Sequence, residues 1–118
     1  VGGGGSTINH TLTVVSTSFG DKFAIDGVDQ ATLSFEKGNT YIFTASQFSL
    51  TNHPFKFSTT NDGTHNGGTP YNTGVVQVGS YGVSGSYIEL NINKNTPRTL
   101  YYYCSNHLGM GGQINIIS

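Results

Sequence analysis

The sequence contains a single cysteine, Cys104, which excludes a disulfide within the chain. Because there is no disulfide pattern, cysteine usage does not reveal the redox compartment of the protein. Cys104 must therefore be free, bound to a ligand or paired with another chain. Taken alone, a lone cysteine is most often a small buried hydrophobic residue.

Charged residues are also scarce. Five Lys and Arg side chains and six Asp and Glu side chains give a formal net charge of −1, and they are spread along the chain. The chain therefore has no basic patch for a nucleic acid, and binding to an anionic membrane surface is equally disfavoured. No apolar run approaches the roughly 18 to 20 residues that span a bilayer, and no signal-peptide pattern is present. We expect no nucleic-acid partner and no membrane span.

The length of the chain predicts one domain. Its 118 residues are enough for a single hydrophobic core and too few for a second one. Residues 1–6, Val-Gly-Gly-Gly-Gly-Ser, have the composition of a flexible linker or tag, so residues 7–118 form the predicted domain. The first residue is Val1 rather than Met, which indicates a mature product or a piece of something larger. We expect a monomer or a domain of a larger protein.

The rest of the chain favours strands and turns. Gly, Ser, Thr and Asn are abundant, no amphipathic helix can be traced, and short β-type runs alternate with turn signals. The clearest predicted hairpin joins residues 31–35 and 40–44 through a four-residue turn that contains glycine. Further runs cover residues 11–15, 22–25, 54–58, 75–78, 86–92, 100–104 and 113–117. We predict an all-β fold, a Greek-key sandwich or barrel of seven to eight strands.

The segment most informative about chemistry is Tyr-Tyr-Tyr-Cys-Ser-Asn-His-Leu-Gly-Met-Gly-Gly, residues 101–112. It holds the only cysteine and the only methionine of the chain, Cys104 and Met110, with His107 midway between them. A thiolate, an imidazole and a thioether at this spacing can converge on one point, and they suit a soft or borderline metal. Two histidines, one cysteine and a weak axial methionine form the ligand set of a blue copper site. Met110 could instead fill a gap in the core.

One histidine ligand is missing from this segment. His53 is the best candidate, because it lies where a loop enters a strand about fifty residues upstream. His10 and His65 compete for the role but rank lower, since His10 lies near the flexible start and His65 in a loop rich in Gly and Asn. His65 could hold a second, weaker metal. Zinc in a Cys/His site remains an alternative to copper, although methionine is an unusual zinc ligand.

The pattern His…Cys-x-x-His-x-x-Met after an aromatic strand resembles the cupredoxins, notably plastocyanin and amicyanin. This resemblance implies a cupredoxin fold and one type 1 copper ion that carries single electrons. It also implies that His53, Cys104 and His107 are the equatorial ligands and Met110 the axial one. Tyr103 matches a position that serves plastocyanin as a remote electron-exchange site, although ordinary sheet packing explains it as well. We expect an electron carrier and no enzyme.

A nearer likeness in motif is to cupredoxin-like domains of marine phage virion proteins, carried by residues 52–65 and by the Tyr-Tyr-Tyr-Cys segment. It suggests an alternative function, a structural or attachment domain in which copper is stabilising. A periplasmic, extracellular or virion location is favoured. One departure from plastocyanin is Pro54, where an Asn is usual after the upstream ligand. Asn52 or Thr51 could replace the hydrogen bond that this Asn would make.

The resemblance also guides expectations for the surroundings of the metal. Backbone N–H groups around Asn106 and of the residue after the upstream histidine are predicted to donate to the cysteine sulfur. The exposed edge of His107, with Leu108 and Gly109 beside it, is predicted as the docking surface for a redox partner protein. No acidic patch is present to steer a basic partner to it.

Overall fold

The structure is a computed structural model that describes residues 5–118. Residues 1–4 of the predicted linker lie outside the described residues. Within the described part, Ser6 is joined to the domain, because its N–H donates to the Asn39 side chain and its carbonyl accepts from the N–H of Thr40. No helix in residues 5–118 is long and apolar enough to cross a membrane.

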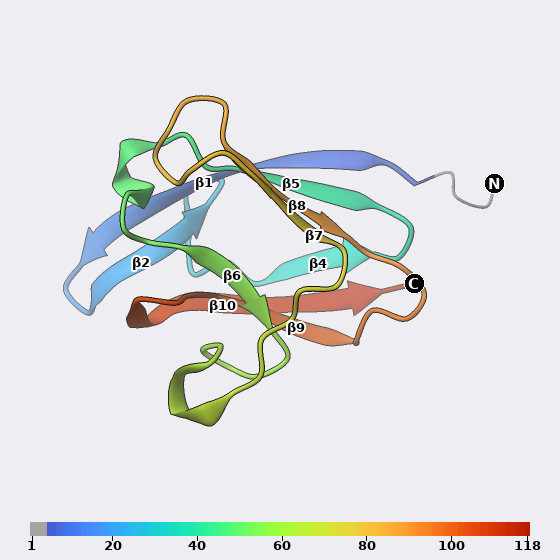
Figure 1. The fold of residues 1–118 in the computed structure, drawn as a ribbon. Coiled ribbons are helices and arrows are strands. Elements are labelled where there is room, and N and C mark those ends of the chain that lie inside the picture. Colours follow the sequence, from blue (N-terminus) through green and yellow to red (C-terminus); the bar gives the residue numbers. More distant parts are fainter. Residues whose placement is uncertain (1–4) are drawn as a thin grey trace.

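Two sheets face each other in a sandwich (Figure 1). The six-stranded sheet has the order β3-β2-β1-β5-β8-β7, and the four-stranded sheet has the order β4-β10-β9-β6. In chain order the strands are β1 (Thr7–Thr17), β2 (Gly20–Ile25), β3 (Val28–Asp29), β4 (Leu33–Glu36), β5 (Thr40–Thr44), β6 (Phe55–Ser58), β7 (Val75–Val78), β8 (Tyr87–Asn91), β9 (Thr99–Cys104) and β10 (His107–Ile117). The described residues hold no α-helix, only the short 3-10 turns η1 (Phe48–Leu50) and η2 (His65–Gly67). The predicted all-β sandwich is confirmed, with ten strands rather than seven to eight.

The core between the sheets is aromatic. Alternating strand residues place their side chains inward, and Phe55 and Phe57 share the buried face of β6. The rings of Phe35 and Tyr41 stack with centroids 3.6 Å apart across the interior. The largest fully buried side chains include Tyr102, Phe23, Phe35, Phe43, Phe55 and Phe57.

The predicted hairpin of residues 31–35 and 40–44 is wrong. β4 pairs in parallel with β10, whereas β5 pairs with β1 and β8, so the turn between β4 and β5 crosses from one sheet to the other. The alternation that suggested a hairpin has another cause. Phe35 and Tyr41 both point into the same core from opposite sheets, and this arrangement gives the same apolar pattern as two paired strands.

The predicted loop between residues 104 and 113 is mostly strand. β10 starts at His107, opposite Cys104, and its pairing with β9 is interrupted between His107 and Gly112. This β-bulge lies at the end of the sandwich away from the C-terminus (Figure 1). It frees the backbone groups of this segment from the ladder and leaves them to other partners.

Candidate metal centre

The ends of three strands bring His53, Cys104 and His107 together. Cys104 ends β9 and is fully buried, and its backbone lies opposite His107 of β10 and Phe55 of β6. His53 precedes Phe55 by two residues. The sheet register therefore carries His53 to the cysteine, although 51 positions separate them in sequence.

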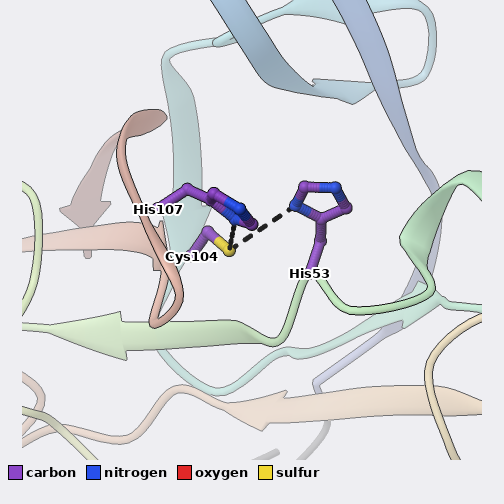
Figure 2. A group of neighbouring side chains, drawn as sticks. All are labelled: His53, Cys104 and His107. Atoms are coloured by element: carbon purple, nitrogen blue, oxygen red, sulfur yellow. Dashed lines mark hydrogen bonds between the residues drawn. The ribbon is translucent and has the colours of Figure 1, made fainter.

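The donor atoms of these three side chains face one another. The Cys104 Sγ lies 3.8 Å from His53 Nδ1 and 3.6 Å from His107 Nδ1, and all three donor atoms lie within 4.8 Å of one another. The centroids of the two imidazole rings are 4.7 Å apart, and the ring planes are tilted by 38° to each other. Figure 2 shows the three side chains. This is the only such cluster of His, Cys, Asp and Glu among residues 5–118. Two Nδ1 atoms and one sulfur around a shared point can bind one metal ion.

Met110 lies close to this cluster. It is 1 % exposed and lies within the bulge of β10. Met110 lines a surface hollow together with His107, Leu108 and Phe19. A thioether beside a thiolate and two imidazoles makes a soft donor set, which fits one copper ion and does not suit Mg²⁺ or Ca²⁺.

The electrostatics of Cys104 favour a protonated thiol while no metal is bound. Burial raises the pKa of this thiol, and the nearby Asp62 carboxylate also raises it, while N–H groups of Asn106 and His107 lower it by donating to the sulfur. The predicted donor at Asn106 is confirmed. The second predicted donor is wrong, since Pro54 follows His53 and proline has no N–H. The N–H of His107 donates instead.

The surroundings of His53 favour its neutral form, which is the form that binds a metal. Burial and the neighbouring His107 lower its pKa, and the Asp21 carboxylate, 3.9 Å from Nε2, opposes this shift. A histidine with a pKa below its usual value of about 6.5 is neutral at pH 7. A neutral imidazole has a lone pair on one ring nitrogen, so it can bind a metal without loss of a proton.

The other two histidines lie outside the cluster. His10 Nδ1 is 2.7 Å from Asp26 Oδ2, and its ring stacks near Phe35. His65 Nε2 is 2.8 Å from the carbonyl oxygen of Cys104, so its ring supports the cysteine backbone rather than a second metal. Tyr103 is 3 % exposed, and this burial agrees with sheet packing rather than with an exposed electron-exchange site.

Several residues near the centre escaped the sequence analysis. The exposed Phe19, in the turn between β1 and β2, reaches the hollow beside His107. Lys22, Gln30 and Asp62 hydrogen-bond to the backbone next to Met110. No local motif marks these residues, because each contact joins segments at least 47 positions apart in sequence.

Rusticyanin and pseudoazurin are among the solved structures with a similar fold. Rusticyanin from Thiobacillus ferrooxidans is 23% identical, with a TM-score of 0.50 over 96% of this chain and 79% of that one. A methionine-to-leucine variant of rusticyanin is also 23% identical, with a TM-score of 0.53 over 96% and 78%. A pseudoazurin from Sinorhizobium is 16% identical, with a TM-score of 0.50 over 96% and 75%. No family model and no curated protein matches the chain.

These likenesses show that the chain has the cupredoxin fold, as its sequence motif predicted. Rusticyanin is described as a copper protein. The cluster of His53, Cys104 and His107 occurs on this fold with Met110 nearby, and this donor set supports a single type 1 copper ion.

Proposed function

We propose that this protein binds one copper ion and transfers single electrons. His53, Cys104 and His107 are the equatorial ligands in this proposal, and Met110 is the axial ligand. The observation that carries it is the placement of the Cys104 sulfur and one ring nitrogen from each of His53 and His107 within 4.8 Å of one another. Copper would supply the change between Cu(I) and Cu(II). The cupredoxin likeness favours an electron carrier over an enzyme.

The protein's part is to hold the ligands in one geometry for both oxidation states. Cys104 and His107 lie on paired strands of one sheet, and Cys104 is fully buried. The Asn106 N–H group donates to the sulfur and stabilises its negative charge. Asn106 also donates from its side chain to the carbonyl of Asn52, which ties the two ligand-bearing loops together at 3.1 Å. Little rearrangement is then needed when the charge of the site changes.

The surface near His107 is the proposed docking site for a redox partner protein. Leu108 is 67% exposed and Phe19 is 87% exposed, and both line the hollow beside His107. Gly109 is half-buried and contributes less surface than Leu108. We expect an apolar partner face around a central polar contact at the His107 ring, because such a face would cover both side chains.

The deciding experiment is to add Cu(II) to the metal-free protein and record visible absorption and paramagnetic resonance spectra. We expect a thiolate-to-copper absorption band that is lost in Cys104→Ser. His65→Ala serves as the control, since the His65 ring meets the Cys104 carbonyl oxygen and the Tyr103 ring and supplies no donor to the cluster, and we expect it to keep the band. No band in the wild-type protein, or an unchanged band in Cys104→Ser, would refute copper binding through this thiolate.

The alternative is a structural or attachment domain in a virion or on a cell surface, in which copper only stabilises the sandwich. The phage-like sequence motifs favour it, and the comparisons with solved structures add nothing to it. Reversible oxidation and reduction with fast electron self-exchange would support electron transfer. Copper that raises thermal stability without a reversible redox couple would support the structural role. For electron transfer we favour the periplasm or the cell exterior as the location.

A further inference from the structure

Gly109, the residue that precedes the proposed axial ligand, is held by side chains rather than by the sheet. Both carboxylate oxygens of Asp62 lie 3.1 Å from the N–H nitrogen of Gly109. On the other side, Lys22 Nζ donates to the Gly109 carbonyl at 2.7 Å. Gln30 donates to the same carbonyl at 3.2 Å and to the carbonyl of Gly111 at 2.8 Å. We call Lys22, Gln30 and Asp62 the Gly109 clamp.

The β-bulge explains why Gly109 needs such partners. The β9–β10 pairing is interrupted between His107 and Gly112, so Gly109 has no partner in the ladder. Gly109 also has φ +70°, a left-handed conformation that side-chain-bearing residues adopt with strain. Gly109 is only partly exposed, and leaving its N–H and C=O unpaired there would be costly.

The charges of the clamp match the backbone groups they hold. The carboxylate lies at the positive N–H end of the Gly109 backbone and the ammonium at the negative carbonyl end, and hydrogen bonds to ionised groups are stronger than neutral ones. Within residues 5–118, Lys22 and Asp62 form no ion pair with each other. Both charged groups hydrogen-bond to Gly109 instead, and its carbonyl belongs to the peptide bond that leads into Met110.

We propose that Lys22, Gln30 and Asp62 are positioning residues that set how closely the Met110 thioether approaches the metal. The proposal rests on the proposed copper function. Asp62 holds the Leu108–Gly109 peptide by its N–H, and Lys22 and Gln30 hold the Gly109–Met110 peptide by its carbonyl. The backbone on both sides of the Gly109 Cα is therefore fixed, and with it the start of the Met110 side chain. Axial ligation is the weak, adjustable contact of such a site, and it tunes both spectrum and potential. Three residues distant in sequence thereby control the electronic properties of the centre.

The test compares the Cu(II)-loaded wild-type protein with Lys22→Met and Asp62→Ala. Each variant removes one side of the clamp. We expect both to change the ratio of the thiolate-to-copper absorption bands in the same direction, because both loosen the Gly109 backbone that leads into Met110. The conservative Lys22→Arg should restore the wild-type ratio. Lys37→Met, a lysine in a surface groove with Arg98 and the C-terminal residues, is the matched control and should leave the ratio unchanged.

Two further measurements separate positioning from simple charge effects. If Lys22 and Asp62 act only as point charges, their variants shift the reduction potential in opposite directions and leave the band ratio unchanged, which would overturn the proposal. In a Met110→Leu background the effect of both variants on the band ratio should disappear, because the two sites are then uncoupled. A persistent effect would also overturn it.

A measurement on the metal-free protein tests the clamp itself. We expect amide hydrogen exchange at Gly109 to become at least tenfold faster in Asp62→Ala, while the amides of β9 stay protected. An unchanged Gly109 rate would overturn the proposal even if the variants fold normally. Absence of any copper band in the wild-type protein would instead refute the proposed function, and with it this inference. Copper binding with unaltered variant spectra would refute the inference alone.

Discussion

At the scale of single residues, hydrogen bonds set the chemistry of several ionisable groups. Asp26 is an example outside the metal centre. Burial disfavours its charged form, but hydrogen bonds from the Thr11 N–H and from His10 outweigh this and hold the pKa of Asp26 below its usual value. Asp26 also adopts φ 52°, a conformation that Asp and Asn tolerate better than most residues. The pair of Asp26 and His10 fastens β1 to the turn after β2.

Because the pKa of Asp26 is lower in the folded state, its contribution to stability is present above the unfolded pKa of about 3.9 and is lost as the pH falls through the folded value. We predict that Asp26→Asn lowers the free energy of unfolding at pH 7 by about 0.5 kcal/mol, since the side chain is half exposed. This difference should shrink below about pH 4. Urea unfolding at pH 7 and pH 3 measures it.

Asp29→Asn is the matched control for this prediction. Asp29 is exposed in β3 and makes no side-chain hydrogen bond within residues 5–118, so its replacement should be neutral at both pH values. A difference between Asp26→Asn and wild type that persists unchanged at pH 3 would contradict the assigned cause.

At the scale of elements, the bulged β9–β10 pair determines the site. It places His107 opposite Cys104 and then lets Met110 return to the interior. Gly111 makes this close approach possible, because a Cβ there would lie 1.6 Å from the carbonyl oxygen of Tyr102. The contact is with backbone, which cannot rotate away as a side chain can. β10 can therefore run this near β9 only with glycine at position 111.

We predict that Gly111→Ala pushes β10 away from β9 and lowers the free energy of unfolding by about 1 to 3 kcal/mol. It should also weaken the thiolate-to-copper band, since Met110 is the preceding residue and the ladder that holds Cys104 is displaced. Gly20→Ala is the control, because nothing lies within 4 Å of a Cβ at that position and only its φ of +99° adds strain. Equal losses in the two variants would argue against a specific role of the bulge.

At the scale of the whole molecule, the centre depends on the complete fold. Its donors come from the loop before β6, the end of β9 and the start of β10, and only the folded sheet brings them together. A ligand that binds the folded state in preference to the unfolded state stabilises it by mass action. Copper binding should therefore raise the free energy of unfolding of the whole sandwich.

We predict that free copper at about a hundred times its dissociation constant stabilises the protein by about 2.7 kcal/mol. For a domain of this size the midpoint of thermal unfolding should rise by about 10 °C. Calorimetry with and without copper measures this shift. In Cys104→Ser the shift should be much smaller, and an equal shift there would mean that copper binds elsewhere.

Local patterns in the sequence determined much of this protein. Alternating apolar residues and turn signals predicted an all-β sandwich, because side chains of a strand alternate between two faces. The spacing of Cys104, His107 and Met110 predicted a centre for a soft metal, since donors three residues apart can meet around one turn. These inferences needed only the properties of neighbouring residues.

Only the tertiary structure decided which segments meet. Alternation defines the buried face of a strand but not its partner, so it could not separate β4 and β5 into different sheets. The register of β6 on β9 brings His53 to Cys104. From the sequence, His53 could be proposed as a ligand only through the expected fold and the family likeness. The contacts of Lys22 and Asp62 with Gly109 join distant segments through backbone atoms, and such contacts leave no local pattern in the sequence.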